Sequence, residues 1–270
     1  MPRFHIRELM DKLERGQCET ANPFNPAQKR QISLNPGDID GIVFWTRYCE
    51  NPEILTRFLI EKDIPYYFLY TITNYPSWLE TNAPDLNKTL ENFIRLSEIS
   101  GRDRTVWRYD PILLTENLSY QYHLGNFNKL CDRLKDFTDT VIVSLYDEYG
   151  CSERNLSRIR SQLGPNLPLP SAKFSSFLEE IRQISEAHGI KIQCCCEPRI
   201  ADHSSIKPGA CVSLSRLLSG GGDFNKLKSP KKDPGQRKNC LCDKSADIGA
   251  YNSCAGGCLY CYANKKSIKL

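Results

Sequence analysis

Hydrophobic and polar positions follow two patterns along the first 195 residues. Short runs of almost continuous aliphatic, aromatic and β-branched residues are separated by longer segments in which apolar residues recur every three or four positions. The short runs predict strands of a sheet that is covered by helices; they are 41–46, 66–72, 105–109, 140–145 and 191–195. The longer segments predict helices, at 52–62, 84–100, 120–137 and 171–188.

This alternation of strands and helices predicts a parallel sheet built from right-handed crossovers. Five strands, with room for more before residue 41 and after residue 210, favour an α/β fold of the complete or partial (β/α) TIM-like barrel type. The glycine motifs of dinucleotide-binding and phosphate-binding folds are absent from the sequence, which disfavours those folds. We expect the barrel-like domain to span residues 1–218.

Several predicted strands end in polar side chains. Thr71 and Thr73 follow one strand, and Arg108 and Asp110 follow the next. In a barrel the carboxyl ends of the strands meet on one face, where active sites form. A charged pair directly after an apolar strand is costly unless it is paired or used, so Arg108 and Asp110 are the candidate catalytic residues. Thr71, Thr73 and Arg108 are candidate contacts to a cofactor or substrate.

Composition narrows the class of protein. Lys and Arg number 36 against 32 Asp and Glu, the net charge is +4, and 40% of residues are hydrophobic, as in an ordinary soluble globular protein. No apolar run reaches the roughly 18 residues of a membrane span, and the amino-terminal residues do not resemble a secretion signal. The sequence therefore predicts a cytoplasmic protein with no membrane partner.

Residues 219–239 differ in character from the rest of the chain. Three consecutive glycines are followed by a basic stretch that carries Lys226, Lys228, Lys231, Lys232, Arg237 and Lys238. We expect a solvated linker here, with docking of an anionic cofactor or a nucleic acid as the alternative.

The chain has 13 cysteines, which is unusual for its length. In a reducing cytoplasm such residues bind metal or carry out redox chemistry more often than they form disulfides. Four are scattered among the predicted elements and are expected to pack as small hydrophobes: Cys18, Cys49, Cys131 and Cys151. The other nine lie between residues 194 and 261.

The last three cysteines form a short motif, Cys254-x-x-x-Cys258-x-x-Cys261, with Gly256 and Gly257 inside it. Three thiolates on so short a loop can bind three irons of a 4Fe-4S cluster and leave the fourth iron open. Zinc is the alternative, but it prefers a fourth protein ligand and Cys-x-x-Cys pairs, so the cluster is favoured. We expect residues 240–270 to form a cluster-binding segment that packs on the barrel.

A second metal site is predicted upstream. Cys240 and Cys242 form a Cys-x-Cys pair, which Cys211 and a cysteine of the 194–196 run can complete, around either an iron–sulfur cluster or zinc. In an extended strand Cys194 and Cys196 point away from Cys195, so the three cannot easily bind one metal.

The loop Gly257-Cys258-x-Tyr260-Cys261-Tyr262-Ala263 resembles the radical S-adenosylmethionine superfamily, and in particular its spore photoproduct lyase branch. The resemblance implies that the open iron binds S-adenosylmethionine and that an electron from a ferredoxin- or flavodoxin-type donor cleaves it to a 5′-deoxyadenosyl radical, which acts on a small-molecule substrate. Nucleic-acid repair or modification is an alternative from the same resemblance. A third is a non-catalytic zinc or iron–sulfur module, structural or redox-sensing.

In most of the superfamily the loop follows the first strand, so its place at the end of this chain suggests a circularly permuted barrel.

Almost the whole chain resembles a bacterial family catalogued as domain-of-unknown-function family 1848. The matching stretches are 22–26, 43–46, 71–75, 107–112, 236–242, 245–251 and the terminal cysteine loop. The resemblance implies that Cys195 is the residue that joins Cys211, Cys240 and Cys242 in the second site. Relatives begin with a further strand, which we expect this chain to lack. They also carry Lys-Asn-Pro where this chain has Arg47-Tyr48-Cys49.

Overall fold

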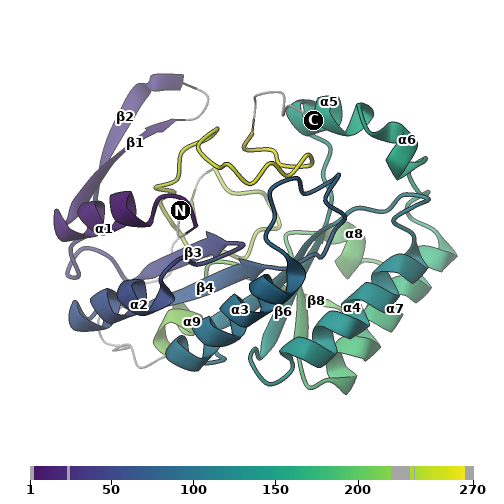
Figure 1. Cartoon of the computed structure of the whole chain (residues 1–270), viewed down its shortest axis with the longest axis horizontal. Coiled ribbons are helices and arrows are strands. Elements are labelled where there is room, and N and C mark those ends of the chain that lie inside the picture. The colour runs from purple at the N-terminus through teal and green to yellow at the C-terminus, as the bar shows by residue number, and fades with distance from the viewer. Residues whose placement is uncertain (1–2, 23–24, 220–231, 234, 265–270) are drawn as a thin grey trace.

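A six-stranded parallel sheet forms the centre of the computed structural model, which describes residues 3–22, 25–219, 232–233 and 235–264 (Figure 1). Its strands are paired in chain order: β3 (Ile42–Thr46), β4 (Tyr66–Thr71), β5 (Thr105–Ile112), β6 (Thr140–Leu145), β7 (Lys191–Cys195) and β8 (Lys207–Gly209). The α/β class and the five predicted strands are confirmed. Among the described residues β3 and β8 are the edges of the sheet and do not pair, so the complete barrel is not formed there.

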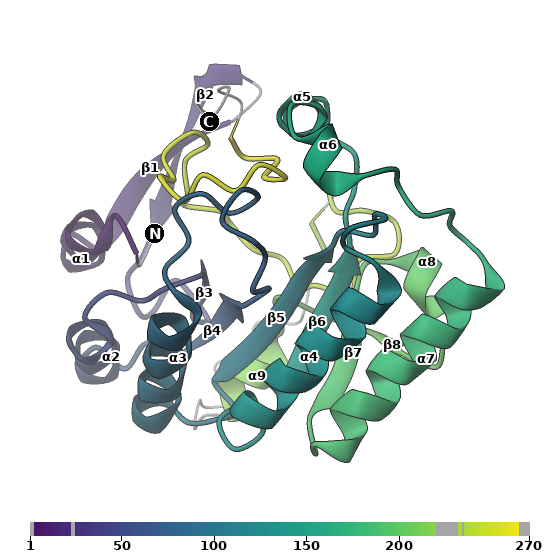
Figure 2. The ribbon, with the colours of Figure 1, turned by 45° about the vertical axis from the view of Figure 1, so that its right-hand side comes forward.

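Four long helices cover one face of the sheet: α2 (Pro52–Glu61), α3 (Leu86–Ser100), α4 (Tyr120–Leu134) and α7 (Ala172–Ala187) (Figure 2). Their apolar sides pack against sheet residues such as Phe68 and Trp107 in the main core. The last three helices are each capped by a side chain that accepts a hydrogen bond from a backbone N–H of the first turn. The capping residues are Asp85, Ser119 and Ser171. These caps place the starts within two residues of the predicted positions.

The opposite face of the sheet is covered by irregular chain. Tyr67, Leu69, Val106 and Ile142 point to this face and pack with Cys211, Val212, Leu217 and Cys242. The short helix α9 (Leu214–Ser219) lies behind the sheet (Figure 1). The Tyr67 hydroxyl donates to the Cys211 carbonyl at 2.5 Å and accepts from the Ser213 N–H at 2.9 Å. This segment therefore buries the apolar surface that an open sheet would otherwise expose.

The remaining elements lie around the carboxyl ends of the strands. An antiparallel hairpin of β1 (Gln17–Asn22) and β2 (Asn25–Ser33) follows α1 (Ile6–Glu14), so the described residues before 41 add no strand to the parallel sheet. Short helices α5 (Gly150–Ser157), α6 (Arg160–Leu163) and α8 (Pro198–Ala201) complete the described secondary structure. None of the described helices combines the length and hydropathy needed to cross a bilayer.

A histidine is buried between α4 and the sheet. The Tyr109 hydroxyl lies 2.8 Å from Nδ1 of His123, and Nε2 lies 3.1 Å from the carbonyl oxygen of Leu113. Because a carbonyl can only accept, Nε2 carries the proton and Tyr109 donates to Nδ1. His123 is fully buried, and this burial lowers its pKa to about 4.

His123 should make the stability of the fold sensitive to mild acid. Its pKa is lower in the folded state than the ordinary value of 6.5, so the unfolded chain takes up a proton first and stability falls as the pH drops from 6.5 toward 4. We expect this group to remove up to about 3 kcal/mol over that range. Urea unfolding at several pH values should show a steeper loss for the wild type than for His123→Gln. Parallel pH profiles for the two proteins would contradict this.

Candidate metal centres

The terminal cysteine loop is held at the carboxyl ends of β3 and β4, where Figure 2 shows the yellow segment crossing above the sheet. The Leu259 N–H donates to the Leu79 carbonyl at 3.0 Å, and Cys258 forms a β-bridge with Glu80. The Asn82 N–H donates to the Gly256 carbonyl at 3.2 Å. Since residues 79–82 follow β4, the loop lies on the face where the polar strand ends were predicted to meet.

A buried carboxylate anchors this loop. Glu80 is 3% exposed and accepts from the Thr73 hydroxyl at 2.5 Å, from Arg47 at 2.9 Å and from the Tyr260 hydroxyl. Burial opposes the charge of Arg47, but Glu80, Tyr260 and Cys258 together outweigh burial and raise the pKa of Arg47 well above its usual value. Arg47 therefore keeps its positive charge in the interior. The sequence analysis missed Glu80, because no local pattern marks a carboxylate whose partners are far apart along the chain.

Two sulfurs of the loop lie close to Gly256. The Gly256 N–H donates to Cys254 Sγ at 3.3 Å. A Cβ at Gly256 would lie 3.2 Å from Cys254 Sγ and 4.0 Å from Cys258 Sγ, so both sulfurs surround one narrow space. Gly257 has a φ of +66°, which favours glycine. Cys254 is exposed, whereas Cys258 and Cys261 are half-buried, so this set is open to solvent on one side.

The second set of cysteines is compact. The sulfurs of Cys195, Cys211 and Cys242 all lie within 4.8 Å of one another. Cys240 packs against the same cluster, although its sulfur is outside this compact group. The four residues grouped in the sequence analysis are therefore brought together, from the end of β7, the loop after β8 and the segment before the terminal loop.

Hydrogen bonds prepare Cys242 to bind a cation. The thiols of Cys195 and Cys211 donate to Cys242 and hold its pKa far below the usual range. The backbone N–H groups of Cys211 and Val212 also donate to Cys242 Sγ, at 3.2 and 3.3 Å. Charge-assisted bonds of this kind favour the thiolate, which is the form that binds metal.

Arg108 and Asp110 form an ion pair at the carboxyl end of β5, and Asp110 also accepts from the Ser144 hydroxyl. The charge of Arg108 acts on Cys195, on Cys211 and on Tyr262 of the terminal segment. Its Nε is buried without a hydrogen-bond partner among the described residues. Arg108 is therefore within electrostatic reach of both cysteine-containing segments.

The two threonines differ in their surroundings. Thr71 is paired in register with Arg108 and is buried at the end of β4. Thr73 is also buried, but its hydroxyl already donates to Glu80 and lies 3.2 Å from an Arg47 nitrogen. Thr73 therefore supports the anchor of the terminal loop.

The remaining cysteines are placed outside these two sets, and none of the 13, all of which the structure describes, forms a disulfide. Cys194 is buried in the main core, on the face of β7 opposite Cys195, and Cys196 follows the strand with a φ of +49°. Cys18, Cys49 and Cys131 are buried in the main core as predicted. Cys151 is half-buried, and its thiol donates to the Tyr262 carbonyl at 3.3 Å.

The basic segment is described only in part, since Lys226, Lys228 and Lys231 lie outside the described residues. Arg237 pairs with Asp147 at 3.1 Å and donates to the Tyr149 hydroxyl at 2.9 Å. The charge of Arg237 is therefore used within the fold, which weakens the case for nucleic-acid docking through this residue.

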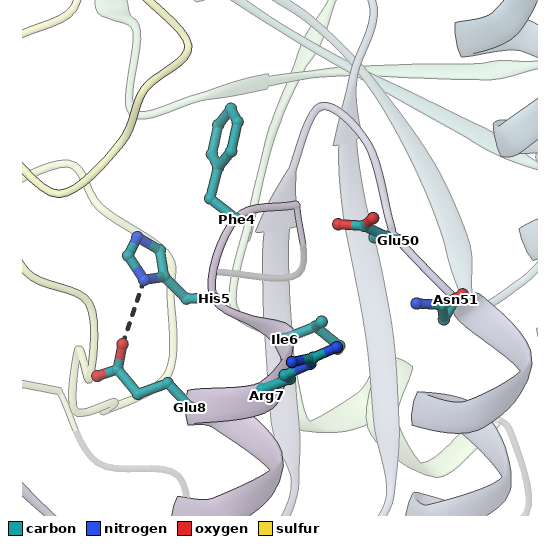
Figure 3. Close-up of a pocket in the computed structure, with 7 residues that line it drawn as sticks. All are labelled: Phe4, His5, Ile6, Arg7, Glu8, Glu50 and Asn51. Carbon is teal, nitrogen blue, oxygen red and sulfur yellow. Dashed lines mark ion pairs between the residues drawn. The ribbon is translucent and has the colours of Figure 1, made fainter.

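Two cavities lie near the carboxyl ends of the strands. One, of about 290 Å³, is lined by Cys196, Glu197 and Arg237 among others. The other, of about 470 Å³, lies between the residues at the start of α1 and the loop before α2 (Figure 3). Its histidine, His5, is turned toward Glu8 and away from Glu50 and Asn51 across the cavity. Neither cavity contains a sulfur of the two cysteine sets.

Replacing Glu80 should release the terminal loop. Glu80→Ala leaves a buried guanidinium and two hydroxyls without their acceptor, so we expect a loss of about 3 kcal/mol in the free energy of unfolding. Hydrogen exchange of the Leu259 amide should accelerate because its bond to Leu79 depends on this anchor. Glu53→Ala is the matched control, since Glu53 forms an exposed pair with Arg95 and should cost less than about 1 kcal/mol. Equal effects of the two substitutions would contradict the anchoring role.

The two cysteine sets can be compared with what is known of related chains. No curated protein matches this sequence significantly. A family model described as "Domain of unknown function (DUF1848)" matches residues 1–263, which includes β3 to β8 and every cysteine of both sets. By this match the chain belongs to the DUF1848 family.

Proposed function

We propose that this protein is an iron–sulfur enzyme of the radical S-adenosylmethionine type, with Cys254, Cys258 and Cys261 as the ligands of a 4Fe-4S cluster. The observation that carries the proposal is the terminal loop: its first two sulfurs both lie within 4.0 Å of the position of a Cβ at Gly256, and the loop is anchored at the carboxyl edge of a parallel sheet. Cysteines that bind a cubane lie further apart than those around one ion, because each binds a different iron. The absence of this trio from the compact metal-binding group of the described residues agrees with that wider spacing.

Cys254, Cys258 and Cys261 would hold the cluster, which would supply one-electron reductive cleavage of S-adenosylmethionine. The electron would come from a ferredoxin- or flavodoxin-type donor, and methionine and 5′-deoxyadenosine would be the products once a hydrogen atom is taken from the substrate. The chain itself supplies binding, orientation and shielding. The exposed Cys254 leaves one side of the loop accessible, whereas the Glu80 anchor fixes the other side.

In this proposal Arg108 and Asp110 bind the cofactor or the substrate. They are both 16% exposed, close to the terminal segment, and the unpartnered Nε of Arg108 can donate to a carboxylate. Thr71 lies beside Arg108 and is a further candidate contact. Thr73 has the supporting role described above.

The chain order of the sheet and the position of the loop also support a circularly permuted, partial (β/α) barrel. Strands β3 to β8 follow one another in sequence, as in such barrels, and the loop reaches their carboxyl edge from the end of the chain. In the cytoplasm, where we place the protein, reduced thiols would be available for cluster assembly.

Anaerobic reconstitution tests the proposal directly. The chain incubated with iron and sulfide, then with dithionite and S-adenosylmethionine, should bind four irons at the terminal loop and release 5′-deoxyadenosine. Cys258→Ala should abolish this product, whereas Cys151→Ser should not, because Cys151 lies beside the terminal segment without belonging to the motif. An intact cluster that yields no 5′-deoxyadenosine would overturn the enzyme proposal.

Gly256 offers a steric test of the same loop. Gly256→Val places a side chain between two sulfurs that the loop must present to the cluster, so iron bound after reconstitution should fall at least several-fold. Gly235→Val is the control, because a Cβ at Gly235 would meet nothing within 4 Å. Iron and acid-labile sulfide, measured per chain, are the readout. Full iron loading of the Gly256 variant would mean that the loop does not hold the cluster as proposed.

A non-catalytic metal-binding module is the second candidate function, and the compact trio of Cys195, Cys211 and Cys242 favours it. In that case metal would only fasten the carboxy-terminal segment to the sheet. Zinc without iron or sulfide at the terminal loop, after anaerobic purification, would select this alternative.

A further inference from the structure

We infer that Cys195, Cys211, Cys240 and Cys242 form a closed site for one tetrahedrally coordinated ion of the zinc type, and that this ion fastens the chain over the second face of the sheet. The inference concerns the compact set alone and does not depend on the proposed catalytic function of the terminal loop.

The distances between the sulfurs fit one bound ion. Zinc binds thiolates at about 2.3 Å, so sulfurs at the corners of a tetrahedron around it lie about 3.8 Å apart. Cys195, Cys211 and Cys242 have their sulfurs within 4.8 Å of one another, which one ion can bridge after small side-chain movements. A multi-iron cluster binds its cysteines through different iron atoms and would hold three sulfurs further apart.

Cys240 is the candidate fourth ligand. It lies two residues before Cys242 and packs in the same cluster as the other three cysteines, but its sulfur is outside their compact group, so its side chain must turn toward them to bind the ion. Four cysteines complete a structural zinc site and leave no open position for a substrate. The burial of Cys211 and Cys242 agrees with a closed site.

Neighbouring groups compensate the negative charge of the site. Four thiolates around a divalent ion leave a net charge of about −2, which is costly to bury without compensation. The positive charge of Arg108 acts on Cys195 and Cys211, and two backbone N–H groups point at Cys242 Sγ. These groups supply the compensation that a buried tetrathiolate site needs.

The position of the site gives it a structural role. The Asp243 N–H donates to the Val212 carbonyl at 3.0 Å, and the Leu214 N–H donates to the Asp243 carboxylate at 2.7 Å. An ion held by Cys195, Cys211 and Cys242 would join β7, the loop after β8 and this segment at one point. Such a link closes long loops of the chain, and its binding free energy adds to that of folding.

The test uses the full chain with Cys254, Cys258 and Cys261 all changed to serine, so that metal at the terminal loop cannot contribute. We expect this variant, purified without chelator, to contain one zinc per chain and no acid-labile sulfide. Exchange for cobalt should give one bound Co²⁺ with the intense visible absorption of a tetrahedral thiolate site.

Single substitutions in that background identify the ligands. Cys240→Ser and Cys242→Ser should each reduce bound zinc at least tenfold or shift the cobalt spectrum, while Cys194→Ala should retain one ion because Cys194 points to the opposite face of β7. The cobalt spectrum of the parent variant still tests the site if a single variant fails to fold.

Three results would overturn the inference: iron with acid-labile sulfide in the triple-serine variant, no bound metal, or full zinc binding after loss of Cys242. This test and the test of the catalytic proposal have separate outcomes. If the protein binds zinc here but produces no 5′-deoxyadenosine, the closed site is supported and only the enzyme proposal is overturned.

Discussion

The structure depends on the need to cover both faces of an apolar parallel sheet. Helices α2, α3, α4 and α7 cover one face, but Tyr67, Leu69, Val106 and Ile142 leave a second apolar face that the described strands do not close into a barrel. The chain covers it with residues from 211 to 218 and from 240 to 242. This packing brings Cys211, Cys240 and Cys242 next to Cys195 on the same face of the sheet. Hydrophobic burial is non-directional, yet here it positions thiols whose metal coordination would depend strongly on geometry.

At the carboxyl edge of the sheet, polar interactions hold the terminal cysteine loop in position. The last cysteine loop has few apolar side chains with which to bind the rest of the protein, although Leu259 and Tyr260 pack into a small second core. Glu80 adds charged and hydroxyl partners from β3, β4 and the loop itself. Buried ion pairs contribute little net stability but penalise every alternative arrangement in which one partner is left alone. The network therefore defines where the loop lies more than how tightly it is held.

Much of the fold was predictable from the sequence because the dominant patterns are local. Strands with continuous apolar residues and helices with three-and-four spacing were found within a few residues of their observed bounds, as for 140–145 and α7. Short elements such as β8 and α9 were missed, since three to six residues carry too little periodicity. The grouping of Cys195 with Cys211, Cys240 and Cys242 came from family resemblance, and the alternation of Cys194 and Cys195 across β7 supplies its physical reason. Glu80 and Arg47 could not be paired from the sequence, because 33 positions separate them and neither stands in a recurring pattern.

The two cysteine sets differ in ways that suit different tasks. A site that takes up an external ligand needs an unshielded side, and the terminal loop has one at the exposed Cys254. A site that only fastens the chain benefits from burial and from groups that neutralise its charge, as around Cys242. Arg108 acts electrostatically on Cys195 and Cys211 of the compact set and on Tyr262, the residue after Cys261, so it is within electrostatic reach of both segments. Its pairing with Asp110 keeps that guanidinium in place while leaving Nε unpartnered among the described residues. Metal bound at the compact set, as proposed, would therefore change the charge beside a guanidinium that also interacts with the terminal segment.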